Sequence, residues 1–212
     1  MDQFRRPTGR RGRLVAALMN RRHETLTLWG LTHVNIEPDY LILDVGCGGG
    51  QTVNRLAQRA SLGKVFGIDY SADMVDYSKK VNKKLITENR VEIVKGSVEK
   101  MGFSNNFFDL VTAIETYYFW PSFVDALKEI MRVLKPSGKL LIVNEMVKDG
   151  LYEVKHAKMI EQTHVRLLPL EEIRDVMQTV GFVEVQIFTK AGSPWNAILA
   201  KNSKTLPNRM TC

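Results

Sequence analysis

Three closely spaced glycines, Gly46, Gly48 and Gly50, follow an apolar segment and come before a segment that suits a helix. Glycines at such a turn let the backbone approach a ligand closely, because no Cβ occupies the space. The dinucleotide-binding pattern G-x-G-x-x-G would need a glycine at position 51, where this chain has Gln51. The loop therefore predicts a nucleotide-type cofactor site but disfavours a dinucleotide pyrophosphate.

Two acids stand near this loop in the sequence. Asp69 follows the next apolar segment, 64–68, and an acid at the end of a second strand accepts hydrogen bonds from ribose hydroxyls. Its two oxygens suit two hydroxyl donors. Asp44, before the loop, can orient the loop or meet an ammonium group of the ligand. Loop and acid together predict a cofactor that contains adenosine.

The length of 212 residues suits one domain with a substantial core, and no linker rich in Pro, Gly or Ser divides the chain. The longest apolar run near the start, 14–19, is too short to cross a bilayer. Cys47 and Cys212 are the only cysteines, and neither has a C-x-x-C partner. We therefore expect a cytoplasmic protein with no signal peptide, membrane span or anchor.

The net charge of +7 is concentrated at the start of the chain. Residues 1–22 hold seven arginines and one acid, Asp2, whereas the remaining 23 basic and 22 acidic residues nearly balance. Such an arm can bind nucleic acid or an anionic membrane surface, or it can be a solvated terminus. After it, residues 14–31 are expected to form one or two amphipathic helices that end near Gly30.

Short apolar segments alternate with longer helical segments from Tyr40 onward. Nearly continuous apolar strands suit a parallel sheet that helices cover on both faces. The pattern predicts strands at 41–46, 64–69, 91–95, 108–114 and 139–144, and helices at 51–60, 71–87 and 122–134, with Ser71 as the N-cap of the second helix. This alternation is typical of a Rossmann-like, doubly wound α/β fold.

The last third of the chain departs from this alternation. The expected elements are helices at 151–165 and 170–180, the latter ended by Gly181, and strands at 182–189 and 195–200. A short Gly-Pro turn joins the two strands, so the sheet should finish with an antiparallel hairpin strand.

Four motifs in register resemble those of the class I S-adenosylmethionine-dependent methyltransferases: LDVGCGGG at 43–50, GIDYS at 67–71, FDLVTAIE at 108–115 and VLKPSGKLLIVNE at 133–145. The resemblance covers roughly residues 40–200. It implies a mostly parallel seven-stranded sheet with one late antiparallel strand. It also implies S-adenosyl-L-methionine as cofactor and S-adenosyl-L-homocysteine as product.

The resemblance also implies cofactor-binding residues along the strand ends. Asp69 would bind the ribose, Tyr70 and Met74 would pack near adenine, and Ser97 stands where the family often has an acid. Glu115 would help to line the methionine end. The complete implied set is Asp44, Gly46, Cys47, Gly48, Asp69, Tyr70, Met74, Ser97, Val98, Ile114 and Glu115.

Aromatic residues at 117–120 follow the strand expected at 108–114. They can wall an acceptor pocket or pack in the core. Enzymes that methylate nucleobase amino groups carry an Asn/Asp-Pro-Pro-aromatic signature there, which this chain lacks. C5-methylation of pyrimidines needs a cysteine nucleophile, which neither Cys47 nor Cys212 is placed to provide. These features disfavour methylation of nucleobases. The nearly neutral body and the absence of a nucleic-acid module favour a small-molecule acceptor.

Methyl transfer from a sulfonium mainly needs alignment, with a base only where the acceptor must lose a proton. The candidates for acceptor contact or proton removal are Tyr117, Tyr118, His156 and His164. Both histidines belong to E-x-x-H pairs, but these pairs fall on one expected helix. A carboxylate-bridged metal site needs ligands from several elements, so we predict no metal ligands.

The expected organisation has three parts: a basic arm with lid helices at 1–35, a methyltransferase domain at 36–202 and a flexible tail at 203–212. A lid insertion is expected at about 146–168. The leading function is methyl transfer to a small molecule. Two alternatives stay open: a methyltransferase that acts on RNA or protein through the basic arm, and a non-catalytic S-adenosylmethionine-binding protein. The missing fingerprint glycine disfavours an NAD-dependent dehydrogenase.

Overall fold

The computed structural model describes residues 23–163 and 165–204. The basic arm at 1–22, residues 205–212 and His164 lie outside the described residues, as does the side chain of His156. Within the described part of the chain, no helix is long and apolar enough to cross a membrane.

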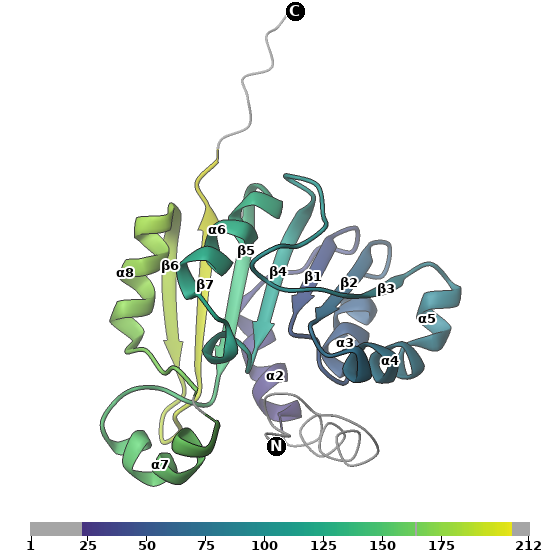
Figure 1. Ribbon diagram of the computed structural model, residues 1–212. Helices are drawn as coiled ribbons and strands as arrows, with labels where there is room; N and C mark the ends of the chain where they lie inside the picture. The colour runs from purple at the N-terminus through teal and green to yellow at the C-terminus, as the bar shows by residue number, and fades with distance from the viewer. Residues whose placement is uncertain (1–22, 164, 205–212) are drawn as a thin grey trace, which may run out of the picture.

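Seven strands form one sheet in the order β3-β2-β1-β4-β5-β7-β6 (Figure 1). They are β1 (Leu41–Val45), β2 (Lys64–Asp69), β3 (Val91–Lys95), β4 (Phe108–Ile114), β5 (Leu134–Asn144), β6 (Phe182–Thr189) and β7 (Asn196–Asn202). The pairs among β1 to β5 are parallel, whereas β7 runs antiparallel to both β5 and β6. The predicted Rossmann-like sheet with an antiparallel hairpin strand is confirmed.

Helices cover both faces of the sheet (Figure 1). They are α2 (Glu24–Gly30), α3 (Gln51–Arg59), α4 (Ala72–Val81), α5 (Lys83–Thr87), α6 (Phe123–Val133), α7 (Leu151–Thr163) and α8 (Leu170–Val180), with 3-10 turns η1 (Leu31–His33) and η2 (Tyr117–Phe119). α6 and α8 pack on one face of the sheet, and α2, α3 and α4 on the other.

Alternate residues of the central strands face two different cores. On β1, Leu43 packs with the α6–α8 core and Ile42 with the α2–α4 core; on β5, Leu140 and Leu141 divide in the same way. This alternation follows from the two-residue period of a strand. Because helices cover both faces, every one of these positions is apolar, as the sequence pattern predicts for a parallel sheet.

The single helix predicted at 71–87 is wrong, because the chain forms α4 and α5 with a break at Asn82. Asn82 is 1% exposed, and its side-chain amide donates to the carbonyl oxygens of Gly50 and Ser78 at 3.0 Å. The break thus puts a side-chain donor beside the glycine loop. A periodicity argument along one segment does not detect that contact with a distant loop.

Two strand boundaries also differ from the predictions. β5 begins at Leu134 instead of residue 139, because Leu134 pairs with Phe108 before a register shift. β7 runs from Asn196 to Asn202, a little later than predicted. At the start of the described chain, α2 ends at Gly30 as expected.

The carboxyl ends of β1, β2 and β4 meet at one edge of the sheet, and α2 lies beyond that edge (Figure 1). α7 lies at the same end of the molecule, below β6 and β7 in the view (Figure 1). Loops that follow parallel strands gather at one edge, which is where open α/β sheets bind ligands. α2 is held there by Leu26 and Leu31, which are each 1% exposed.

Gly30 sets how closely α2 approaches the sheet. A Cβ at this position would overlap the methyl groups of Val143 on β5. Gly30→Ala should therefore lower the free energy of unfolding by about 1–3 kcal/mol through overpacking, although alanine is the better helix former. Gly102→Ala is the matched control, since a Cβ there would meet nothing within 4 Å. Urea titration of both variants measures the difference, and equal stabilities would contradict the tight α2–β5 contact.

Candidate functional site

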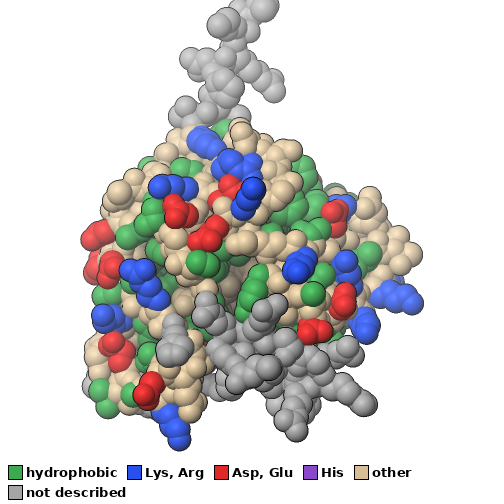
Figure 2. All heavy atoms as spheres, viewed as in Figure 1, with side chains coloured by type: hydrophobic (Ala, Val, Ile, Leu, Met, Phe, Trp, Pro, Cys, Tyr) green, Lys and Arg blue, Asp and Glu red, His purple; other side chains and the backbone are tan. Residues whose placement is uncertain are grey.

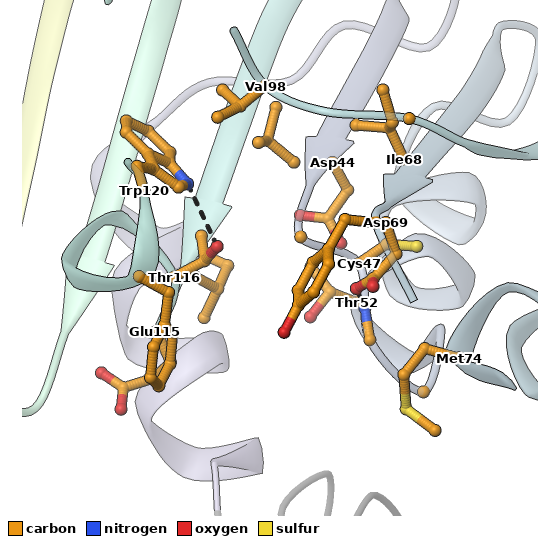
Figure 3. Close-up of a pocket in the computed structure, with 18 of the residues that line it drawn as sticks. Asp44, Cys47, Thr52, Ile68, Asp69, Met74, Val98, Glu115, Thr116 and Trp120 are labelled. Carbon is orange, nitrogen blue, oxygen red and sulfur yellow. Dashed lines mark hydrogen bonds between the residues drawn. The ribbon is translucent and has the colours of Figure 1, made fainter. Parts of the chain in front are cut away.

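A cavity of about 300 Å³ opens at the carboxyl edge of β1, β2 and β4. All eleven residues predicted to contact a cofactor line it. Figure 3 shows Asp44, Asp69 and Met74 on one side of the cavity and Glu115, Thr116 and Trp120 on the other. The sequence motifs, far apart along the chain, therefore converge on one space.

The glycine loop has a conformation that side chains rarely adopt. Gly46, Gly48 and Gly50 have φ angles of 69°, 48° and 79°, all in the left-handed region. A Cβ at Gly46 would overlap the side chain of Thr116, so glycine is required there for packing. A Cβ at Gly48 would meet only the Gly46 carbonyl, at 3.9 Å. The backbone at Gly48 thus borders open cavity, in which a ligand can approach it directly.

Asp69 joins the loop after β1 to the loop after β2. Its Oδ2 accepts a hydrogen bond from the Gly48 amide at 2.9 Å, and its Oδ1 accepts one from the Ser71 amide at 2.8 Å. Burial raises the pKa of Asp69, and these two amide donors oppose that shift. Each carboxylate oxygen has two acceptor sites, so each retains one for a ligand hydroxyl. The geometry therefore fits a ribose diol.

Asp44 places a second buried carboxyl group against the cavity. It is 1% exposed and accepts a hydrogen bond from the Thr112 hydroxyl at 2.7 Å. Burial raises the pKa of Asp44 to about 7, the Thr112 hydrogen bond lowers it and the nearby Asp69 raises it further. A cation in the cavity would favour the ionised form, so this wall suits a positively charged ligand.

An apolar slot adjoins Asp69. Ile68, Met74 and Val98 line it and are each at most 7% exposed, whereas Tyr70 at the rim is 42% exposed. Ser97 lines the same region of the cavity. The nearby Glu99 does not line it; the Glu99 carboxylate instead accepts a hydrogen bond from the Ser122 amide. The slot fits a flat apolar ring such as adenine.

Glu115 lies at the other end of the cavity on a strained backbone. Its φ of 57° is uncommon for a residue with a side chain. The carboxylate accepts hydrogen bonds from the Tyr118 hydroxyl at 2.8 Å and from the Glu145 amide. Burial raises the pKa of Glu115 to about 7; His23 lowers it and Glu145 raises it. Strain of this kind is concentrated at functional sites, and here it holds an acid against the cavity.

His23 lies between the two glutamates. Its Nε2 is 3.8 Å from an oxygen of Glu115 and 3.8 Å from an oxygen of Glu145. The ligand atoms of these three side chains lie within 4.8 Å of one another, which is close enough for a metal-binding group. A protonated His23 would form ion pairs with both carboxylates. His23 therefore partly compensates the negative charge of the two glutamates at this end of the cavity.

The candidate acceptor residues Tyr117 and Tyr118 do not line the cavity. They are 2% and 4% exposed, and burial raises the pKa of both hydroxyls, that of Tyr117 to about 12. The Tyr117 hydroxyl accepts a hydrogen bond from the Leu168 amide, and Tyr118 donates to Glu115. The tyrosines thus support the wall from behind. Of the other aromatic residues of that segment, Phe119 and Trp120 line the cavity.

Several lining residues escaped the sequence analysis. The described cavity also includes His23 and Thr27 from the α2 region, Thr52 and Arg55 from α3, and Thr116. The indole of Trp120 donates to the Thr116 hydroxyl at 3.3 Å (Figure 3). The α3 residues follow the glycine loop at helical spacing, which is a signal that could have found them. The sequence analysis expects lid helices within 1–35, but no local pattern indicates which residues of α2 line the cavity.

Comparison with known proteins agrees with this geometry. The fold is similar to that of the methyltransferase solved in complex with the Trm112 activator of Haloferax volcanii, with a TM-score of 0.78 and 17% identity over 89% of this chain and 94% of that one. A family model described as a methyltransferase domain matches residues 43–142. The chain is thus similar to methyltransferases in sequence over this segment and in fold over most of its length. A second similar structure, that of Haemonchus contortus phosphoethanolamine N-methyltransferase 2, was solved in complex with S-adenosyl-L-methionine; its TM-score is 0.73, with 18% identity over 85% of this chain and 53% of that one.

Two curated methyltransferases illustrate the sequence similarity. The chain is 30% identical over 170 residues to 24-methylenesterol C-methyltransferase 2 of Oryza sativa subsp. japonica, a match that covers 75% of this chain and 46% of that protein. It is 30% identical over 123 residues to demethylmenaquinone methyltransferase of Oceanobacillus iheyensis, covering 58% of this chain and 51% of that protein. The chain thus spans about half the length of these relatives.

Asp44 should reduce the stability of the ligand-free protein at neutral and alkaline pH. Its pKa is raised on folding, so folding is penalised once the solution pH ionises the carboxyl group in the unfolded chain. The penalty grows as pH rises from about 4 to about 7 and is constant above that. Asp44→Asn should therefore raise the free energy of unfolding by about 1–3 kcal/mol at pH 8 and change it little at pH 4.

Urea titration at the two pH values measures this difference. Asp76→Asn is the control, because Asp76 is exposed on α4. If Asp44→Asn lowers stability at pH 8, the carboxylate is stabilised by a charge that the described residues do not provide.

Proposed function

We propose that this chain transfers a methyl group from S-adenosyl-L-methionine to a small-molecule acceptor. The supporting observation is that one cavity joins the glycine loop and Asp69 at one end to Glu115 and Trp120 at the other. A ligand held by its adenosine at the first end would present its other end toward the second. The cavity volume of about 300 Å³ is at the lower end of the range for small-molecule sites.

The residues of the cavity have separable roles in this proposal. S-adenosyl-L-methionine supplies a methyl group that is already activated on a sulfonium. Gly48 lets the backbone approach the ligand, Asp69 fixes the ribose, and Met74 and Val98 enclose the adenine. Asp44 places negative charge beside a cationic ligand. The protein thereby aligns donor and acceptor and excludes water, which is the main requirement for an in-line displacement.

A small-molecule acceptor is supported by the surface and by the relatives. Lys and Arg are interspersed with Asp and Glu over the described surface in view, without a broad patch of one sign (Figure 2). Both relatives described above have names that specify a small molecule, a sterol or demethylmenaquinone. In our proposal the segment 146–168, which includes α7, forms the lid over the acceptor. The two cysteines fit a reducing compartment, and we propose the cytoplasm.

Asp69 provides the most specific test of donor binding. Asp69→Asn removes the charge from the hydrogen bonds to the ribose, each of which contributes on the order of 1.5–3 kcal/mol. The variant should bind S-adenosyl-L-homocysteine about 10- to 100-fold more weakly in calorimetric titration. Asp76→Asn, on the exposed face of α4, should bind it as the wild type does. Equal affinity of wild type and Asp69→Asn would place the ribose elsewhere.

The class of acceptor can be tested before the acceptor is known. S-adenosyl-L-methionine carrying a labelled methyl group is incubated with the protein and a cell extract, which is then divided into small molecules, RNA and protein. Label should accumulate in the small-molecule fraction in excess of a control without the protein. Label in RNA or protein would support the alternative that uses the basic arm. Ligand binding without any labelled product would support a non-catalytic binding protein.

A further inference from the structure

The loop between β3 and β4, residues 96–107, borders two open spaces. At its start, Gly96, Ser97 and Val98 line the cavity of the candidate site. Further along, residues 100, 102–104 and 107 line a separate groove of about 380 Å³ beside β3. A segment with open space on two sides has fewer packing contacts to fix its position. The contacts that do hold this loop therefore decide how firmly Ser97 and Val98 stand against the cavity.

α6 holds the loop through Arg132 in its last turn. The guanidinium donates to the carbonyl oxygens of Met101 at 3.0 Å and Phe103 at 2.8 Å, and to the side chain of Asn105 at 2.7 Å. It also donates to both oxygens of the Glu129 carboxylate, at 2.7 and 2.8 Å. A guanidinium has five N–H donors, and these hydrogen bonds use all of them. Each donor of Arg132 thus serves the loop or the acid beside it.

Glu129 holds the same loop from one helical turn earlier. Its Oε1 accepts a hydrogen bond from the Met101 amide at 2.6 Å, so α6 binds Met101 at both its amide and its carbonyl group. The hydrogen bonds from Arg132 lower the pKa of Glu129, burial raises it and the Met101 amide lowers it further. The carboxylate is therefore ionised at neutral pH, which strengthens the hydrogen bonds that it accepts.

A third contact lies beside the cavity. The Glu99 carboxylate accepts a hydrogen bond from the amide of Ser122, which is the N-cap residue of α6. Both ends of α6 thus hold the loop, the first at Glu99 and the last at residues 101–105. Val98, which is 7% exposed, comes directly before this stretch. A shift of the stretch would move Val98 and change the wall of the cavity.

We propose that Arg132 is a positioning residue for the adenine side of the donor site. Arg132 does not line the cavity, and it acts by fixing the loop that carries Ser97 and Val98. A wall that is fixed in advance loses less conformational freedom when the ligand binds, so affinity is higher. This inference rests on the proposed function, because it assumes that the adenine lies beside Val98.

The first test is calorimetric titration of the full chain with S-adenosyl-L-homocysteine, well below the unfolding temperature. Arg132→Gln cannot make the five hydrogen bonds of the guanidinium. It should weaken binding about tenfold, because the ligand must then order the loop. Arg132→Lys keeps a charged group with three N–H donors and should lose no more than about threefold. Unchanged binding by Arg132→Gln would overturn the proposal.

Arg174→Gln is the matched control. Arg174 on α8 also pairs with a glutamate three residues earlier, and its side chain is 35% exposed, against 34% for Arg132. In the described chain its guanidinium donates only to Glu171. The control variant should bind S-adenosyl-L-homocysteine as the wild type does. Equal losses for Arg132→Gln and Arg174→Gln would assign the effect to helix pairing in general and overturn the proposal.

A double-mutant cycle shows whether the effect passes through the loop. Val98→Ala shortens the side chain that Arg132 is proposed to position. In this background Arg132→Gln should weaken binding by less than about threefold, because coupled residues are not additive. The full loss in both backgrounds would contradict an action through Val98. If the wild type does not bind S-adenosyl-L-homocysteine, the proposed function fails and this inference fails with it.

Hydrogen exchange tests the structural step without any ligand. The Met101 amide, which donates to Glu129, should exchange at least about tenfold faster in Arg132→Gln, while the amides of β1 keep their rates. Equal acceleration in β1 would indicate a global loss of stability instead of a released loop. An unchanged rate at Met101 would show that Arg132 does not hold the loop, whatever the outcome for the proposed function.

Discussion

The hydrogen bond from the Gly48 amide to the Asp69 carboxylate is the contact on which the cofactor site depends. It joins the loop after β1 to the end of β2, and the second oxygen of Asp69 holds the Ser71 amide at the start of α4. Asn82, at the end of α4, donates to the Gly50 carbonyl on the far side of the glycine loop. The loop is thereby braced at both ends before any ligand binds.

The site contains two buried acids whose ionised forms are disfavoured by burial. Asp44 and Glu115 are buried, and the pKa of each is raised to about 7 mainly by burial. Both carboxyl groups have hydrogen-bond donors, Thr112 and Tyr118, but no arginine or lysine of the described chain is paired with either. Such an arrangement makes sense for a cavity whose ligand brings a positive charge. The strained backbone at Glu115 fits the same interpretation, since strain persists where the surroundings fix it for function.

Most of the fold and half of the cavity were predictable from the sequence because their signals are local. A short segment of sequence is enough to recognise each continuous apolar strand, the glycine loop and Asp69. The parallel topology then brings the ends of the strands together. The remaining features depend on contacts across the chain. Asn82 interrupts a helix that its own segment would continue, because its amide serves a loop thirty-two residues away.

At the end of the cavity proposed for the acceptor, the residues that line it also depend on contacts that the sequence does not show. Tyr117 and Tyr118 were predicted as pocket residues, but the 3-10 turn η2 directs Phe119 and Trp120 to the cavity and leaves the tyrosines in the core. The face of this turn that points inward is set by its contacts with Phe123 of α6 and with residues 166–168, and not by its residue types. Thr27 was missed for a similar reason, since only the tertiary structure shows which residues of the expected lid helices line the cavity.

A crystal structure of the complex with S-adenosyl-L-homocysteine tests the central claim most directly. The account predicts one ligand along the carboxyl ends of β1, β2 and β4, with both ribose hydroxyls on Asp69 and the adenine beside Val98. A ligand bound elsewhere, or one whose ribose does not touch Asp69, would contradict it.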